Sequence, residues 1–211
     1  MSNVDDLPER TTPHYAVYQH EIFLRGAEKG QLPEFSTDPD ELEKKAQETP
    51  TKGGWLYASS NAGISWTHKA NRDAFYQWTI IPRMLVDTNK RDMSCTLKLG
   101  TSSWTFDEPF GFAPIGISAS LALSLSTRRL APDSLHLTLG AQFVFLGRPW
   151  VYGMSINGEA GVRHVMRSLL ADFDIRLNVA GWTSTDEVTS EVRSEGRRYL
   201  VRSWAGGGAK L

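Results

Sequence analysis

Residues 141–174, AQFVFLGRPWVYGMSINGEAGVRHVMRSLLADFD, carry the pattern that decides the fold. FVFL at 143–146 is a continuous apolar run, which is typical of a strand buried on both faces. Gly147 closes this run, and a helical pattern follows further along the chain. Its apolar residues share one stripe at helical spacing: Val162, Val165, Met166, Leu169, Leu170 and Phe173. The stretch therefore predicts a buried strand, a glycine turn and a helix that packs on a core.

Arginine follows two of the predicted strands. Arg148 comes after the strand at 143–146, and Arg128 comes after a second apolar stretch at 121–125. In parallel α/β barrels, phosphate groups are commonly held by the loops after the seventh and eighth strands. Glycine lets the backbone approach phosphate oxygens, and arginine supplies a charged, forked donor. The pattern predicts a phosphate site, and the alternative is that these arginines are ordinary surface cations.

The composition is that of a globular protein. The 211 residues are 40% hydrophobic and 22% charged, with a formal net charge of −1, and these values argue against wholesale disorder. Adjacent basic residues form doublets at most, so no stripe would follow a phosphate backbone and no nucleic-acid partner is expected. No run approaches the roughly 20 apolar residues that a membrane helix requires, so no membrane contact is expected.

Cysteine usage and the two ends of the sequence bear on location. Cys95 is the only cysteine, which excludes an intrachain disulfide and a four-cysteine zinc site. The first ten residues are polar and acidic, unlike a signal peptide. The last three residues, Ala209, Lys210 and Leu211, differ by one small residue from the Ser-Lys-Leu signal for peroxisomal import. We therefore expect a soluble intracellular protein, either peroxisomal or cytoplasmic.

Local signals upstream predict helices and a hairpin. Residues 14–30 carry apolar side chains near helical spacing, which predicts a short amphipathic helix. A second helix start signal lies in residues 37–50, with Thr37 or Asp38 as the cap. Residues 80–106 consist of extended segments with a glycine-bearing turn, which favours a hairpin.

Three motifs, in this order, resemble one known family. They are YASSNAGISWTHKANRDAFYQWTIIPRML at 57–85, FAPIGI at 112–117 and TLGAQFVFLGRPWVYGMSINGEAGVRHVMRSLLADFDIRLNVAG at 138–181. They resemble the N-terminal segment, the first barrel strand and the C-terminal segment of the FMN-dependent alpha-hydroxy acid dehydrogenases. That family includes glycolate oxidase, lactate oxidase and lactate 2-monooxygenase, and EIFLRG, GGWLYA and APIGI are most similar to the lactate 2-monooxygenase-like branch. The resemblance covers residues 15–188.

The resemblance implies FMN as the cofactor and a small 2-hydroxy acid as the substrate. Tyr57 matches the tyrosine whose hydroxyl holds the substrate carboxylate in the family. The strand backbone that touches the flavin ring matches Pro114, Ile115 and Gly116. The family's phosphate contacts match Arg128, Gly147 and Arg148. However, SLST before Arg128 departs from the family's Asp-Gly-Gly or Asp-Ser-Gly pattern.

The family's catalytic residues have no counterpart in this sequence. Relatives take a proton at a histidine in a His-Gly-Gly-Arg setting, bind the carboxylate with an arginine and stabilise the reduced flavin with a lysine. The histidines of this chain lie in other settings: His14, His20, His68, His136 and His164. We therefore expect no catalytic residue, and we expect these histidines at surface or capping positions.

The implied fold is α/β, a truncated TIM (β/α)8-barrel that keeps the N-terminal cap region and approximately strands 1, 7 and 8. A complete barrel takes roughly 250 residues, and here the predicted strands are 112–117, 121–125 and 143–146. The seam at 118–125 is too short for the helical crossover of a parallel connection. The expected organisation is a disordered lead-in at 1–13, an incomplete domain at 14–188 and a flexible tail at 189–211.

Three interpretations remain open. In the first, the chain is an FMN-dependent oxidoreductase of the 2-hydroxy-acid type with impaired catalysis. In the second, it is a non-catalytic remnant that binds at most FMN phosphate or a full-length homologue, since members of the family typically form homo-oligomers. In the third, a skipped exon or a wrong splice prediction has removed the coding sequence for the centre of the barrel.

Overall fold

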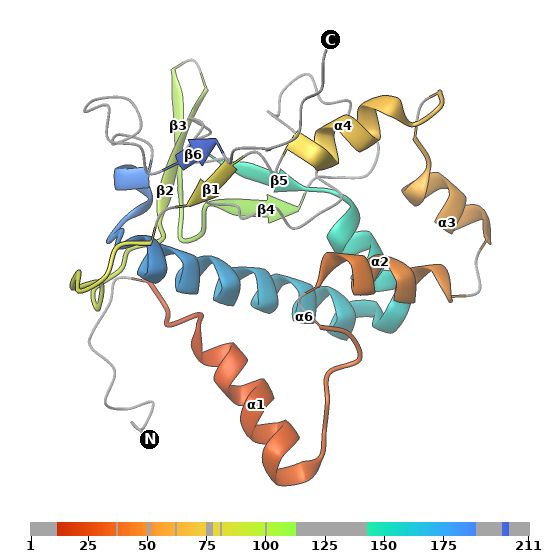
Figure 1. Cartoon of the computed structure of the whole chain (residues 1–211), viewed down its shortest axis with the longest axis horizontal. Coiled ribbons are helices and arrows are strands. Elements are labelled where there is room, and N and C mark those ends of the chain that lie inside the picture. Colours follow the sequence, from red (N-terminus) through yellow and green to blue (C-terminus); the bar gives the residue numbers. More distant parts are fainter. Residues whose placement is uncertain are drawn as a thin grey trace.

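The computed structural model describes residues 12–36, 38–49, 52–61, 63–74, 78–80, 82–99, 101–112, 143–188 and 200–202. Figure 1 shows the arrangement of the elements. In chain order they are α1 (Val17–Lys29), α2 (Pro39–Gln47), α3 (Lys52–Ser59), α4 (Trp66–Ala74), β1 (Trp78–Ile80), β2 (Cys95–Leu99), β3 (Ser102–Phe106), β4 (Phe110–Phe112), β5 (Val144–Leu146), α6 (Arg148–Ala180) and β6 (Leu200–Arg202).

Helix α6 is the element on which the others are arranged. It has 33 residues, and α1, α2 and α3 each pack against it. In Figure 1 it runs across the molecule, with strands β2 to β5 on one side and α1 on the other. The predicted apolar stripe faces the core, because Val165, Leu169, Leu170 and Phe173 are buried.

The two predicted N-terminal helices are confirmed as α1 and α2. Of the two predicted caps for α2, the structure has Asp38, whose carboxylate accepts a hydrogen bond from the Asp40 amide at 2.8 Å. Acidic residues in the first turn and lysines in the last turn complement the helix dipole. These local signals explain why the sequence was sufficient to place both helices.

Within the described residues, the strands form three pairs. Strands β2 and β3 are antiparallel from Cys95 opposite Phe106 to Leu99 opposite Ser102, which confirms the predicted hairpin. Strands β1 and β6 are also antiparallel. Strand β6 therefore lies inside the segment 189–211, for which the sequence predicts a flexible tail.

The parallel pair β4–β5 joins the predicted strand at 143–146 to residues 110–112. Of the predicted strand at 112–117, only Phe112 belongs to the described part of the chain. Phe110 lies opposite Val144, and Phe112 lies opposite Leu146. Strand β4 begins at Phe110, before the predicted start, because the FGF run is itself apolar and extended. The predicted strand at 121–125 and the seam at 118–125 lie outside the described residues.

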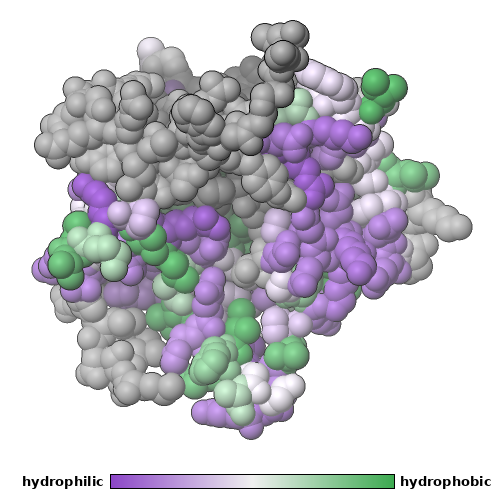
Figure 2. All heavy atoms as spheres, in the orientation of Figure 1, coloured by the Kyte–Doolittle hydropathy of each residue, from purple (hydrophilic) through white to green (hydrophobic). Residues whose placement is uncertain are grey.

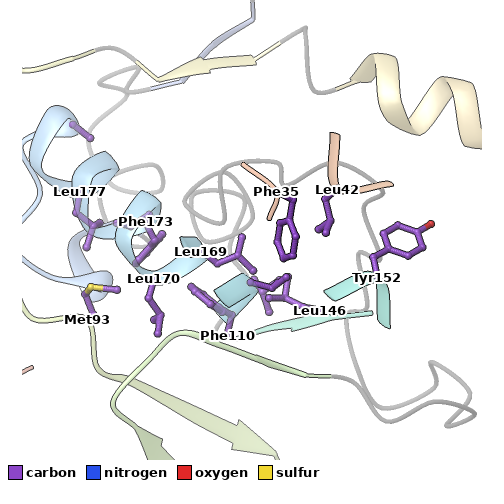
Figure 3. Close-up of a cluster of buried hydrophobic side chains, with 14 of the residues drawn as sticks. Phe35, Leu42, Met93, Phe110, Leu146, Tyr152, Leu169, Leu170, Phe173 and Leu177 are labelled. Carbon is purple, nitrogen blue, oxygen red and sulfur yellow. The ribbon is translucent and has the colours of Figure 1, made fainter. Parts of the chain in front are cut away.

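An apolar core lies between α6, α2 and the β4–β5 pair. Figure 3 shows Leu169 of α6 beside Phe110 of β4, with Phe35 and Leu146 nearby. The rings of Phe110 and Phe173 meet edge to face, with centroids 6.1 Å apart. Strand β5 is therefore held from one side by its pairing with β4 and from the other by the apolar stripe of α6.

The surface is more polar than this core. Figure 2 shows a largely hydrophilic face over α2, and apolar side chains reach solvent near the C-terminal end of α1. Phe23 and Leu32 are the exposed apolar residues there. Within the part of the chain that the structure describes, no helix combines the length and the apolarity needed to cross a membrane.

Helix α6 bends sharply near its start, and two glycines allow the bend. Asn157 and Gly158 have non-helical backbone angles, with φ of +51° at Gly158. The helix before the bend and the helix after it approach so closely that a Cβ on Gly161 would lie 2.0 Å from the carbonyl oxygen of Gly153. The bend therefore requires a residue without a side chain at position 161.

The far end of α6 is fixed to the loop before β2 by a buried ion pair. Arg91 Nε donates to Asp174 Oδ1 at 2.7 Å, and the two side chains are 11% and 0% exposed. The other carboxylate oxygen of Asp174 accepts the Ala16 amide at 3.1 Å, at the start of α1. One carboxylate thus connects three segments that are distant in sequence.

We predict that Gly161→Ala destabilises the chain, because the new methyl group would overlap backbone that cannot move without opening the bend. The expected loss is about 1–3 kcal/mol, the usual cost of overpacking. Gly26→Ala in α1 is the matched control, since its Cβ would meet only ordinary contacts at 3.5 Å or more. Thermal unfolding followed by circular dichroism measures both. Equal melting temperatures for the two variants would contradict the role of the bend.

We also predict a large difference between two aspartates on α6. Asp174→Ala leaves the buried Arg91 charge without its partner, and such a change typically costs about 3–5 kcal/mol. Asp172→Ala removes a half-exposed partner of Arg176 on the same helix, and such pairs are worth about 0–1 kcal/mol. Urea unfolding of both variants gives the comparison. A loss below 1 kcal/mol in Asp174→Ala would show that the ion pair does not hold these segments.

Candidate functional site

The site begins where β5 passes into α6. Gly147 connects the two elements, with φ of −102° and ψ of −89°, and the helix starts at Arg148. The first amides of an α-helix have no acceptor within the helix, and they lie at the positive end of the helix dipole. Pro149 in the first turn contributes no amide hydrogen. A strand end, a glycine and a helix start thus place backbone donors next to Arg148, the first residue of the helix.

Arg148 makes contacts that the sequence did not indicate. Its Nε donates to the carbonyl oxygen of Ala58 at 2.6 Å, and its Nη2 donates to the carbonyl oxygen of Ser60 at 3.0 Å. Both acceptors lie at the C-terminal end of α3. The sequence offered a phosphate contact or an ordinary surface position for Arg148, and nothing in the local pattern pointed to a helix almost ninety positions earlier.

Tyr57 lies on the same helix, α3, one residue before Ala58. The helix also contacts α6 through Trp55 and Tyr152, whose ring centroids are 5.6 Å apart. The structure therefore brings together the helix that carries the predicted substrate tyrosine and the predicted phosphate loop. The structure describes the backbone of Tyr57 and not its side chain.

The other predicted site residues lie outside the described part of the chain. These are Pro114, Ile115, Gly116 and Arg128. Their assignment to the flavin ring and to the phosphate stays a prediction. Of the predicted cofactor contacts, Gly147 and Arg148 are the two that the structure places.

His164 occupies a position that links three elements. The hydroxyl of Tyr18 lies 2.6 Å from Nδ1, and Nε2 lies 2.9 Å from the carbonyl oxygen of Phe35. A carbonyl only accepts, so Nε2 carries the hydrogen; in the neutral imidazole, Tyr18 then donates to Nδ1. With both nitrogens occupied, His164 joins α6, α1 and the loop before α2, and it is not positioned as a general base. The sequence pattern placed it opposite the apolar stripe and did not indicate this link.

The surroundings of Tyr18 favour its protonated form. Burial raises the pKa of the Tyr18 hydroxyl, and the positive charge of Arg167 opposes part of that rise. The guanidinium of Arg167 lies 3.9 Å from the centre of the Tyr18 ring and also pairs with Glu21 at 3.0 Å. A cavity of about 560 Å³ borders this cluster and not the start of α6. The cluster therefore holds α1 on α6, at a distance from the predicted cofactor contacts.

The remaining candidate groups do not assemble a reactive centre in the described residues. His20 is exposed, His14 and His68 are half-buried, and His136 lies outside the described part. Burial, with the negative charges of Asp186 and Glu108, raises the pKa of Cys95 to about 11, so its thiol stays protonated at neutral pH. Among these residues no group of histidine, cysteine and carboxylate side chains is arranged to hold a metal ion.

The protein-family model for FMN-dependent dehydrogenases matches residues 46–130 and 135–195 of the chain. The match includes β5, Gly147, Arg148 and α6, and it also includes α3 with Tyr57. It therefore covers both sides of the contact between Arg148 and the end of α3.

Curated relatives align over shorter segments. An FMN-dependent alpha-hydroxy acid dehydrogenase of Schizosaccharomyces pombe is 48% identical over 70 residues, which cover 33% of this chain and 17% of that protein. A peroxisomal (S)-2-hydroxyacid oxidase of Arabidopsis thaliana is 44% identical over 63 residues, 29% of this chain and 17% of that protein. The alignments thus span about a sixth of the length of these relatives.

Solved structures share the fold at low sequence identity. A soluble mutant of the membrane-associated (S)-mandelate dehydrogenase from Pseudomonas putida gives a TM-score of 0.58 at 14% identity, over 79% of this chain and 99% of that one. A flavocytochrome b2 variant with benzoylformate gives 0.57 at 16% identity, over 88% and 94% of the two chains. This likeness confirms the predicted fold class, a truncated TIM barrel, whereas placement near the lactate 2-monooxygenase branch stays a prediction.

We predict that His164→Phe lowers stability and leaves flavin affinity unchanged. The substitution leaves the buried Phe35 carbonyl and the Tyr18 hydroxyl without the hydrogen bonds that His164 provides. Each unsatisfied group lowers the free energy of unfolding by about 1–3 kcal/mol. His20→Phe, at an exposed position of α1, is the control and should unfold like the parent chain. Chemical denaturation and flavin titration of both variants provide the two readouts. A selective loss of flavin binding in His164→Phe would overturn the structural role given to this residue.

Proposed function

The chain belongs to the family of FMN-dependent dehydrogenases, and from this premise we propose that it binds FMN by its phosphate at the start of α6. The observation that carries the proposal is the passage from β5 through Gly147 to Arg148 and α6. The parallel pairing of β5 with β4 fixes the position of this passage. In this arrangement the phosphate lies beside the first turn of the helix, where backbone amides and a guanidinium converge.

The residues present fit the phosphate end of FMN. Gly147 has no side chain to obstruct an approaching phosphate oxygen, and the helix start favours an anion. Arg148 supplies a positive charge within the same turn and, after its two bonds to carbonyl oxygens, retains other N–H groups for an anion. When bound, FMN would supply the two-electron acceptor for oxidation of a 2-hydroxy acid.

We extend the proposal to the other contacts that the resemblance implies. Arg128 would provide a second cation to the phosphate, and Tyr57 would hold the carboxylate of a small 2-hydroxy acid. Pro114, Ile115 and Gly116 would contact the flavin ring. The relatives support this class of substrate, since one is named for (S)-2-hydroxy acids and another is named glycolate oxidase.

Catalysis is impaired in this proposal, because no residue takes the role of the base. His164 has both ring nitrogens in hydrogen bonds, and no histidine of the sequence has a His-Gly-Gly-Arg setting. A chain that binds FMN and lacks the base would keep the cofactor oxidised in the presence of substrate. The second candidate function, a non-catalytic binding partner of a full-length homologue, is favoured by the same absence.

Location and assembly belong to the proposal as well. A peroxisomal location is supported by the similarity to the peroxisomal (S)-2-hydroxyacid oxidase of Arabidopsis thaliana. Self-association is supported only by the family resemblance, because members of that family typically form homo-oligomers. Fluorescence microscopy of a tagged chain measures its location. Light scattering of the purified chain measures its assembly.

We predict that FMN binds more tightly than riboflavin, which lacks the phosphate. Charge-assisted hydrogen bonds are worth about 1.5–3 kcal/mol, so the expected ratio of dissociation constants is about tenfold or more. Quenching of flavin fluorescence measures both constants under identical conditions. Equal dissociation constants for FMN and riboflavin would show that the phosphate does not contribute to binding, which contradicts the proposal.

The same sample tests the catalytic part. With glycolate, lactate or mandelate added under anaerobic conditions, the absorbance of bound oxidised FMN should stay unchanged. A full-length relative under the same conditions serves as the positive control. Bleaching of the flavin by any of these acids would show that the chain oxidises the acid and reduces its flavin, which contradicts the proposed loss of the base.

A further inference from the structure

We propose that Arg148 is a positioning residue that couples the phosphate loop to helix α3, and so to Tyr57. The inference rests on the proposed function, in which the start of α6 receives the phosphate of FMN. Arg148 then has a role besides its contact with the phosphate, because one edge of its guanidinium binds the C-terminal end of α3.

The first step is that α3 depends on contacts from outside itself. The helix has eight residues, and isolated helices shorter than about 12–15 residues are marginal in water. The last carbonyl groups of any α-helix lack donor partners within the helix. The bonds from Arg148 to Ala58 and Ser60 satisfy two such carbonyls, and a positive charge at this end also complements the helix dipole.

The second step is that Arg148 can serve two sites at once. A guanidinium has five N–H groups in a rigid plane, and Nε and Nη2 each use one of them on α3. The remaining N–H groups project from the same rigid plane. An anion at the start of α6 would therefore restrict the whole fork, including the edge that holds α3. A lysine in this place would retain the charge but lose the planar fork.

The third step concerns Tyr57. It lies between Trp55, which contacts Tyr152 of α6, and Ala58, which accepts from Arg148. Its backbone is thus held on both sides by residues of α6. Restricting Arg148 would fix the backbone of Tyr57 relative to the phosphate, so that phosphate binding and the positioning of α3 become one event.

Hydrogen exchange of α3 tests this coupling in the full chain. The useful amide is that of Ser60, which donates to the carbonyl of Leu56 at 3.0 Å and reports opening of the last turn. The proteins compared are the parent chain, Arg148→Lys, Arg148→Gln and Arg163→Gln. Arg163 is an exposed arginine on α6, so its variant controls for the loss of one positive charge.

In the absence of flavin, Arg148→Gln should exchange the Ser60 amide about tenfold faster than the parent chain, since a hydrogen bond to a charged group is lost. Arg163→Gln should match the parent chain. With FMN added, the parent chain should gain protection in α3, and with riboflavin it should not. At FMN concentrations that saturate each protein, Arg148→Lys should fail to gain the protection of α3 that the parent chain gains.

The outcomes separate the inference from the function on which it rests. Binding of FMN with identical protection of α3 in the parent chain and Arg148→Lys would overturn the coupling and leave the phosphate site intact. Equal exchange rates of the Ser60 amide in all four ligand-free proteins would show that Arg148 does not stabilise the end of α3. Failure of FMN to bind the parent chain would overturn the proposed function and the coupling together.

Discussion

The parallel pairing of β4 with β5 is the constraint on which the rest of the structure depends. It joins residues 110–112 to residues 144–146 and fixes where the chain turns into α6. Because the strand must end in register with its neighbour, Gly147 and Arg148 are placed at a defined edge of the pair. The core then forms between these strands and the apolar stripe of α6, and α1, α2 and α3 pack on the same helix. The position of the candidate site is therefore set by backbone pairing before any side chain takes part.

Two features of α6, its bend and its C-terminal cap, allow the other elements to pack on it. The bend at Asn157 and Gly158 turns the first part of α6 toward α3, and the close approach of Gly153 and Gly161 permits it. At the other end, Gly181 adopts φ of +69°, and Arg83 donates to the carbonyl oxygens of Ala180 and Gly181. The helix thus begins at the candidate site and ends in a capped, buried turn.

Local signals in the sequence were enough for the parts of the fold that depend on neighbours in the chain. The cap at Asp38, the glycine turn between β2 and β3 and the apolar run at β5 each predicted the element that forms. Contacts between distant segments were not predictable in the same way. The partners of Arg148 and of His164 lie on other elements, and the glycines that allow the bend in α6 resemble a loop when seen in sequence. Strand β6 was missed because its pairing with β1 is a tertiary contact, and its surroundings are polar and glycine-rich. At the site, the family resemblance indicated Gly147 and Arg148. The hydrogen bonds from Arg148 to the end of α3 could be recognised only in the three-dimensional structure.

We propose that this chain, a truncated flavin barrel, keeps the phosphate half of the cofactor site. Phosphorus-31 NMR of FMN titrated with the purified chain observes that half directly, independently of the flavin ring and of turnover. The account predicts that the phosphate resonance of FMN shifts and broadens with the parent chain and returns to its free position with Arg148→Gln. An unchanged phosphate resonance at saturating parent chain, or an equal shift with Arg148→Gln, would contradict it.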